Sequence, residues 1–139
     1  MPNEQLFTNF AFELSIPGVS TVGRFSQCSG LELSVDVYEY REGGNNDFIH
    51  RRPGALHYPN LILTHGLTSD EALFNWFWAT HTQAEPKEVM LTLSSSQTTR
   101  SWTFAEAFPV RWSGPQVGAG SGEVATETLE IAHSGLKRA

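Results

Sequence analysis

The chain has 139 residues, of which 40% are hydrophobic and 17% charged, and it carries a formal net charge of −6 with a pI near 5.3. This length suits a single domain with one core, so we expect residues 1–139 to form one domain. The acidic balance argues against a nucleic-acid binder, which needs a basic surface. Aromatic residues make up 12% of the chain, and a surface rich in aromatics and poor in charge favours protein–protein contact.

The cysteine content and the hydropathy of the chain indicate in which compartment it is made and whether it inserts into a membrane. The one cysteine, Cys28, allows neither an intrachain disulfide nor a cysteine zinc site. The N-terminus lacks a basic region followed by an apolar core, and no apolar run approaches the ~18 residues that a membrane span needs. We therefore expect synthesis in the cytoplasm and no integral membrane association.

Alternation of apolar and polar residues predicts strands in the first part of the chain. Residues 9–16 form a half-buried strand that Pro17-Gly18 ends, and residues 19–28 form a weaker one. The clearest alternation covers 31–41. We expect one of its faces to meet a core and the other to meet water. The first face holds Leu31, Leu33, Val35 and Val37, and the second holds Glu32, Ser34, Asp36 and Tyr38.

The segment 42–54 is predicted to be a long loop, because it is too polar and too long for a tight hairpin turn. Loops of this length without internal structure are uncommon in compact domains and are usually functional or disordered. This segment carries charges of both signs and the apolar pair Phe48-Ile49. The combination predicts contact with another molecule.

A helix is predicted after the next strand, which covers 56–65. Thr68 can cap it and Glu71 can complete a capping box, and it should end near His81, before Pro86. A surface helix needs only one apolar stripe, so a second stripe is covered either by the chain's own core or by another subunit. The two stripes are Leu73, Trp76, Phe77 and Thr80 on one side and Phe74, Trp78 and His81 on the other.

Strands are also predicted at 88–94, 101–112 (with a kink at Pro109) and 123–132, followed by a short tail. The total is about seven strands and one helix. This order predicts a mainly β fold, an antiparallel β-sandwich or partial barrel with one α-helix.

No catalytic, cofactor or metal site emerges from the residue pattern. The five histidines lack ligand spacings and are interpreted as surface or interface residues. The glycine-rich run 118–122 lacks the Lys-Ser/Thr of a phosphate loop and leads into a strand. Cys28 has no histidine or acid placed to activate it. Glu39 and Glu42 flank Arg41, which favours ion pairing over acid–base chemistry.

Several segments, in a fixed order along nearly the whole chain, together resemble one family. The most specific are Tyr40-Arg41-Glu42-Gly43-Gly44-Asn45 and Ala132-His133-Ser134-Gly135-Leu136. The others are Phe25–Glu32, Arg52-Pro53-Gly54, Tyr58–Leu61, Gly66-Leu67-Thr68 and Trp112–Pro115. This set resembles the inner tube proteins of contractile phage tails, and most of all those of phage-like contractile injection systems.

The resemblance implies that six subunits form a ring whose strands join into one lumen-facing barrel. Rings stack into a rigid tube inside a contractile sheath, and the tube serves as needle and cargo conduit without catalysis. The implied partners are further copies of the chain, the sheath, baseplate or tube-initiator and cap proteins, and cargo in the lumen. The particle is a virion tail or an injection system.

Two sets of residues are predicted to serve that assembly. The long loop is expected to contact neighbouring subunits through Tyr40, Arg41, Glu42, Phe48, Ile49, Arg51 and Arg52. The polar strand faces are expected to line the lumen through Glu32, Ser34, Asp36, Thr92 and Ser94. An acidic lumen would favour basic protein cargo over tightly held DNA.

Other functions stay open at this point. One alternative is the tail tube of a contractile phage, which passes DNA, and another is a tube-initiator protein at the baseplate. A remote alternative from a different class is a small β-barrel that binds a ligand or acts as an enzyme, which predicts a monomer with an internal cavity.

Overall fold

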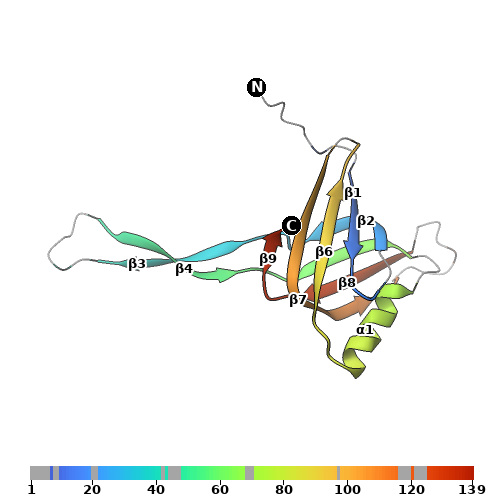
Figure 1. Cartoon of the computed structure of the whole chain (residues 1–139). Helices are drawn as coiled ribbons and strands as arrows, with labels where there is room; N and C mark the ends of the chain where they lie inside the picture. The colour runs from blue at the N-terminus through green and yellow to red at the C-terminus, as the bar shows by residue number, and fades with distance from the viewer. Residues whose placement is uncertain are drawn as a thin grey trace.

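The computed structural model describes residues 7, 10–19, 22–41, 43, 48–67, 71–96, 98–115, 120 and 125–139. In these residues, nine strands and one helix form a body with a long projecting hairpin (Figure 1). The elements are β1 (Ala11–Ser15), β2 (Val22–Ser29), β3 (Ser34–Tyr40), β4 (His50–His57), β5 (Leu61–Gly66), α1 (Ala72–Thr82), β6 (Lys87–Ser94), β7 (Thr99–Ser113), β8 (Thr126–Ala132) and β9 (Leu136–Arg138). The predicted mainly β fold with one helix is confirmed.

Antiparallel pairing closes the strands of the body into a ring. The order is β6-β1-β2-β5-β8-β7, and β6 pairs with β7 to complete the circuit, while β9 adds to β7. The long strand β7 serves both halves of this ring: 99–107 pair with β6 and 108–113 pair with β8. Between them Glu106 has a φ of 49°, and the register shifts between Pro109 and Arg111. β7 therefore passes from one half of the ring to the other between Ala107 and Phe108, next to Glu106, and a register irregularity follows at Pro109, where the kink is predicted.

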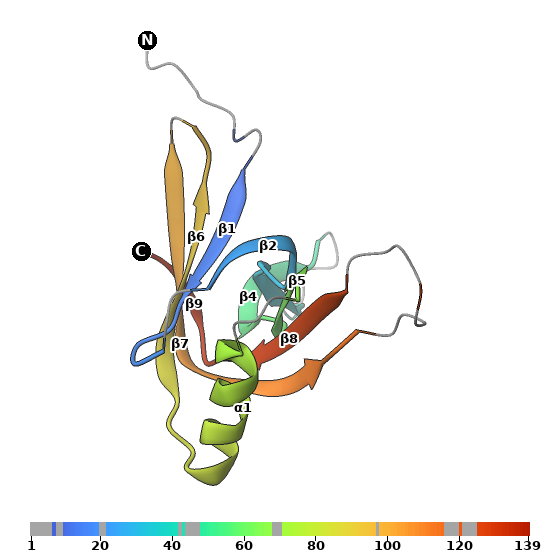
Figure 2. The same ribbon diagram turned by 90° about the vertical axis from the view of Figure 1, so that its right-hand side faces the viewer.

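The two halves meet at a steep angle around the core (Figure 2). One half contains β6, β1 and the first part of β7, and the other contains β2, β5, β8 and the last part of β7. Helix α1 packs against the body through Leu73 and Trp76, which are almost fully buried. The buried core consists of Leu14, Ile16, Phe25, Leu61, Leu63, Leu73, Trp76, Val89, Leu91, Phe104, Ala107, Leu129 and Ile131.

The hairpin of β3 and β4, called here the arm (residues 34–57), projects away from the body (Figure 1). Its apolar face does not pack against the chain's own core: Val35 is 45% exposed and Val37 is 61% exposed. Of the four apolar residues expected to meet a core, Leu31 packs partly buried against the core of the body, whereas Leu33, Val35 and Val37 are exposed in the single chain. Period-two alternation shows that a strand has one face suited to burial, but it does not show which molecule covers that face.

The predicted loop 42–54 is also corrected, because its second half is strand. β4 begins at His50 and pairs with β3 through the register Tyr40 with His50. Pro53 and Gly54 disfavour a regular strand, and the structure accommodates them where the register shifts between Val35 and Val37. Glu42 and residues 44–47 lie outside the described residues.

Three smaller boundaries differ from expectation. The strand predicted at 56–65 is two strands, β4 and β5, separated at 58–60, where Pro59 lies. The predicted tail contains β9, whose Leu136 pairs with Phe104 of β7. The helix begins at Ala72, and Glu71 at its N-cap makes no side-chain capping bond. The predicted cap Thr68 lies outside the described residues.

Candidate functional site

One face of the sheet β2-β5-β8-β7 is polar, whereas its other face belongs to the core. Cross-strand partners share a face, so the registers of these strands define two polar rows. The first row is Ser29, Ile62, Glu130 and Arg111, and the second is Gln27, Thr64, Thr128 and Ser113. These two rows, together with Thr126, are called here the polar sheet face.

Hydrogen bonds between neighbouring strands organise the polar sheet face. The hydroxyls of Thr64 and Thr128 share a hydrogen bond of 3.2 Å, and Asn60 Nδ2 donates to Glu130 Oε2 at 2.8 Å. A hollow of about 380 Å³ lies over β5, β8 and the end of β7. The alternation of β5 and β8 carries the signal for this face in the sequence, but the more regular alternation of 31–41 favours that segment as the lumen lining.

Both outer strands of this sheet leave an edge open. β2 pairs with β1 only through Val22–Phe25, so its residues 26–29 have β5 on one side and no described strand on the other. β7 pairs with β6 only as far as Ala107, so 109–113 have β8 on one side and no described strand on the other. Open strand edges carry unpaired backbone groups that recruit another strand. The sheet is therefore suited to extension at both sides.

The residues predicted to line a lumen are separated by the structure into two places. Glu32, Ser34 and Asp36 are exposed at the base of the arm, where Asp36 Oδ2 lies 2.7 Å from His57 Nε2. Thr92 and Ser94 lie on β6, and Thr92 shares a 3.0 Å hydrogen bond with Ser101 of β7. The structure does not bring the five together on one face. Their lumen-facing role stays a prediction.

The residues predicted to contact neighbouring subunits lie along the arm and are largely exposed. The Tyr40 ring stacks on His50 at 5.0 Å, and the Arg52 guanidinium lies 5.4 Å from the Tyr40 ring centre. Phe48 is 54% exposed although its ring touches His50. The exposed residues of this set are Arg41, Phe48, Ile49, Arg51 and Arg52.

Arg51 already has a partner within the arm. Its Nε lies 3.3 Å from Glu39 Oε1, and both side chains are exposed to solvent. Exposed pairs of this kind contribute about 0–1 kcal/mol. The pair therefore leaves Arg51 available to a carboxylate of another subunit at little cost.

A buried polar network connects three strands of the same sheet. His65 Nε2 is hydrogen-bonded to Glu127 Oε1, and Trp112 Nε1 donates to Glu127 Oε2 at 2.6 Å. Both His65 and Glu127 are buried. The interpretation of all histidines as surface or interface residues is thus wrong for His65, because a buried carboxylate supplies its partner. This network ties β5, β8 and β7 together behind the polar sheet face.

Cys28 has the character of a partly buried structural residue. Burial raises the pKa of its thiol from 9.0 to about 11. Since the thiolate is the nucleophile, a thiol with a raised pKa is poorly reactive at neutral pH.

Within the described residues, no three His, Cys, Asp or Glu side chains gather as a metal site would require. No described helix is both long and apolar enough to cross a membrane.

The chain thus combines an antiparallel barrel-like body and one helix with a sheet that is polar on one face and open at both edges, and with a projecting arm. The sequence matches the family of the T4-like virus tail tube protein gp19 over residues 8–137, so the chain belongs to that family. Among curated proteins, no sequence relative matches this chain.

Solved structures agree with that membership. A chain from the tube-terminating cap of the anti-feeding prophage is 26% identical, with a TM-score of 0.82 over 100% of this chain and 94% of that one. A chain from the extended sheath–tube complex of the extracellular contractile injection system PVC is 25% identical, with a TM-score of 0.80 over 98% of this chain and 93% of that one. Hcp1 from Flavobacterium johnsoniae shares the fold at 17% identity, with a TM-score of 0.57 over 92% and 94% of the two chains.

Proposed function

We propose that this chain is the structural subunit of the inner tube of a contractile injection particle. Rings of the subunit stack inside a contractile sheath and serve as needle and conduit. The observation that carries the proposal is a four-stranded sheet, polar on one face and open at both edges, in a member of the tail tube family. A rigid tube needs no bond chemistry, so no catalytic role is proposed.

The open edges support a ring made by head-to-tail contact. The sheet contains an even number of antiparallel strands, so its outer strands β2 and β7 run in opposite directions. A rotated copy therefore presents its β2 edge antiparallel to the β7 edge of its neighbour. Such a heterologous contact generates a closed ring when the rotation closes, and closure removes every exposed edge. We propose a ring of six copies.

The polar sheet face then forms the wall of the lumen. Its rows are rich in hydroxyl groups, and the one acidic residue, Glu130, lies beside the one basic residue, Arg111. Such a wall attracts cargo weakly and would let protein pass without tight binding. Glu32, Ser34 and Asp36 are proposed to add acidic and polar groups at the base of the arm. Thr92 and Ser94 lie outside this wall and form a separate prediction.

The arm is proposed to connect subunits and rings. Its apolar face, which includes Val35, Val37 and Leu56, is exposed in the single chain and suits burial against another copy. The predicted contact residues Tyr40, Arg41, Phe48, Ile49, Arg51 and Arg52 lie along its outer part. Glu42 is proposed as a further contact residue. The proposed further partners are the sheath, the baseplate or tube initiator, the cap and the cargo, within a particle assembled after synthesis in the cytoplasm.

Electron microscopy of the purified protein tests this proposal. We expect rings or tubes with a central channel by negative stain, and cryo-electron microscopy should place the polar sheet face on that channel. A variant in which residues 43–50 are replaced by a short Gly-Ser turn should give monomers or rings without tubes. A chain that stays monomeric in the presence of its own sheath and baseplate proteins would contradict the proposal.

A further inference from the structure

Two apolar surfaces of the body are not explained by strand pairing or by the arm. The first lies on α1 and consists of Phe74, Trp78 and His81, called here the aromatic stripe. The second is a hollow beside β2 that contains Phe10, Phe12 and Cys28. Each surface flanks one of the two open edges of the four-stranded sheet.

The aromatic stripe lies beside the open edge of β7. Phe74 packs edge-to-face on Trp112 of β7, with ring centres 5.0 Å apart, and Trp78 follows one helical turn later. Trp78 is 52% exposed although it also contacts Phe77 and His81. Since the opposite stripe of α1 supplies Leu73 and Trp76 to the core, burial in the chain's own core does not cover the aromatic stripe. This stripe therefore leaves aromatic surface, above all that of Trp78, exposed in the single chain.

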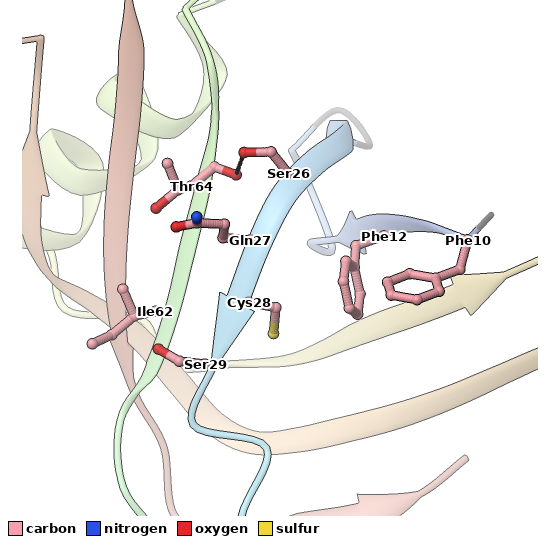
Figure 3. A pocket seen from close by; sticks show the side chains of 8 residues that line it. All are labelled: Phe10, Phe12, Ser26, Gln27, Cys28, Ser29, Ile62 and Thr64. Atoms are coloured by element: carbon pink, nitrogen blue, oxygen red, sulfur yellow. Dashed lines mark hydrogen bonds between the residues drawn. The ribbon is translucent and has the colours of Figure 1, made fainter. Parts of the chain in front are cut away.

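The hollow lies beside the open edge of β2 and measures about 440 Å³ (Figure 3). The Phe10 and Phe12 rings stand on one side of the Cys28 side chain, and the β2 and β5 strands stand on the other. Phe10 is 51% exposed. None of the described residues that line the hollow is charged: Phe10, Phe12, Ser26, Gln27, Cys28, Ser29, Ile62 and Thr64.

We propose that the aromatic stripe of one copy, led by Trp78, seats in the hollow of the next copy around the ring. This inference rests on the proposed function, because the head-to-tail ring is what joins the β7 edge of one copy to the β2 edge of the next. The α1 helix lies beyond the β7 edge and the β1 end stands beyond the β2 edge (Figure 2). Edge pairing therefore brings the two surfaces toward each other.

The chemistry of the two surfaces matches. An uncharged hollow lined by two phenylalanines accepts a tryptophan without leaving a buried charge unpaired. Trp and Phe each bury about 150–250 Å² and prefer edge-to-face contacts with other rings. The occupant is a second copy because the contact continues directly from the strand pairing on the same two edges. A sheath protein on the aromatic stripe is the competing outcome that the experiment distinguishes.

Disulfide cross-linking tests the contact directly, because Cys28 is the only cysteine of the chain. In assembled tubes of the Trp78→Cys variant, an oxidant such as copper–phenanthroline should join Cys28 to the new thiol of the neighbouring copy. We expect a ladder up to six copies on a non-reducing gel, and the double variant Trp78→Cys with Cys28→Ser should abolish it. Ala79→Cys, exposed on another side of the same helical turn, is the matched control and should give no ladder.

A second measurement needs no substitution. Maleimide labelling of Cys28 in the unmodified chain should be at least about tenfold slower in tubes than in dissociated subunits, because a seated Trp78 blocks the hollow. Two results would overturn this contact while leaving the tube function intact: normal tubes of the Trp78→Cys variant that give no ladder, or unmodified tubes that label as fast as free subunits. Failure of the unmodified chain to form rings would count against the proposed function instead.

Discussion

The body and the arm are both antiparallel β structure, yet they are stabilised in different ways. Every residue of the buried hydrophobic core belongs to the body. The arm has no buried residue among those described, and its Val37 and Tyr38 are each 61% exposed. An isolated two-stranded hairpin is at best marginally stable in water.

The difference separates the part of the chain that has a core of its own from the part whose apolar residues are left for contact with another molecule. The body closes its ring of strands within one chain and needs no partner for its core. The arm carries apolar residues at strand spacing but leaves them in solvent. We infer that the body determines the stability of the subunit, whereas the arm affects the stability of the tube.

The largest expected effect is a cavity in the body. Leu129 is fully buried in β8, so Leu129→Ala should lower the free energy of unfolding of the subunit by about 2–5 kcal/mol. Urea unfolding followed by tryptophan fluorescence measures this change. The volume-conserving Leu129→Met should cost less than about 1.5 kcal/mol. An Ala variant as stable as the unmodified chain would mean that β8 is not part of the core.

A smaller effect is expected at the junction between the body and the arm. Gly30 has a φ of +96°, and a Cβ there would lie 2.1 Å from the backbone oxygen of Asn60. Gly30→Ala should therefore cost about 1–3 kcal/mol, because it strains both the backbone and the close approach. Gly43→Ala is the matched control, because a Cβ at that glycine would meet no atom of the described residues within 4 Å, its chain neighbours aside. Equal stability of the two variants would show that the junction tolerates a side chain.

The smallest effect on the subunit is expected in the arm itself. Val37→Ala should change the free energy of unfolding by no more than about 0.5 kcal/mol, as for exposed positions elsewhere. The same change should reduce the yield of tubes, because the arm loses apolar surface that another copy would cover. Tube yield is measured by sedimentation and negative-stain microscopy. A marked loss of subunit stability without loss of tubes would reverse the roles of body and arm.

Periodicity predicted the body well because its strands bury one face within the same chain. The core residues Leu61, Leu63, Leu129 and Ile131 follow the period-two pattern. The pattern of α1 also separated two apolar stripes. The structure buries Leu73 and Trp76 of the first stripe and leaves Trp78 of the second exposed. Periodicity left open whether the chain's own core or another subunit covers the second stripe of α1. The 52% exposure of Trp78 shows that the chain's own core does not cover this residue.

The arm and the polar sheet face could not be derived in the same way. The segment 50–54 lacks alternation and contains Pro53 and Gly54, so strand β4 depends on its pairing with β3. The polar sheet face depends on register, because Glu130 and Arg111 become neighbours only when β8 pairs with β7. His65 and Glu127 are likewise 62 residues apart in sequence and meet only in the folded sheet.

The even number of strands in the open sheet has a consequence for the bore of the tube. Antiparallel pairing at the edges is satisfied by any number of copies, since each copy offers the same two edges. In the ring that we propose, the backbone hydrogen bonds at the edges therefore do not determine the number of subunits. The angle between neighbouring copies sets that number, and side-chain contacts beside the paired edges, such as the proposed one of Trp78 in its hollow, fix the angle. A side chain on a helix outside the wall would then determine how wide a cargo the channel admits.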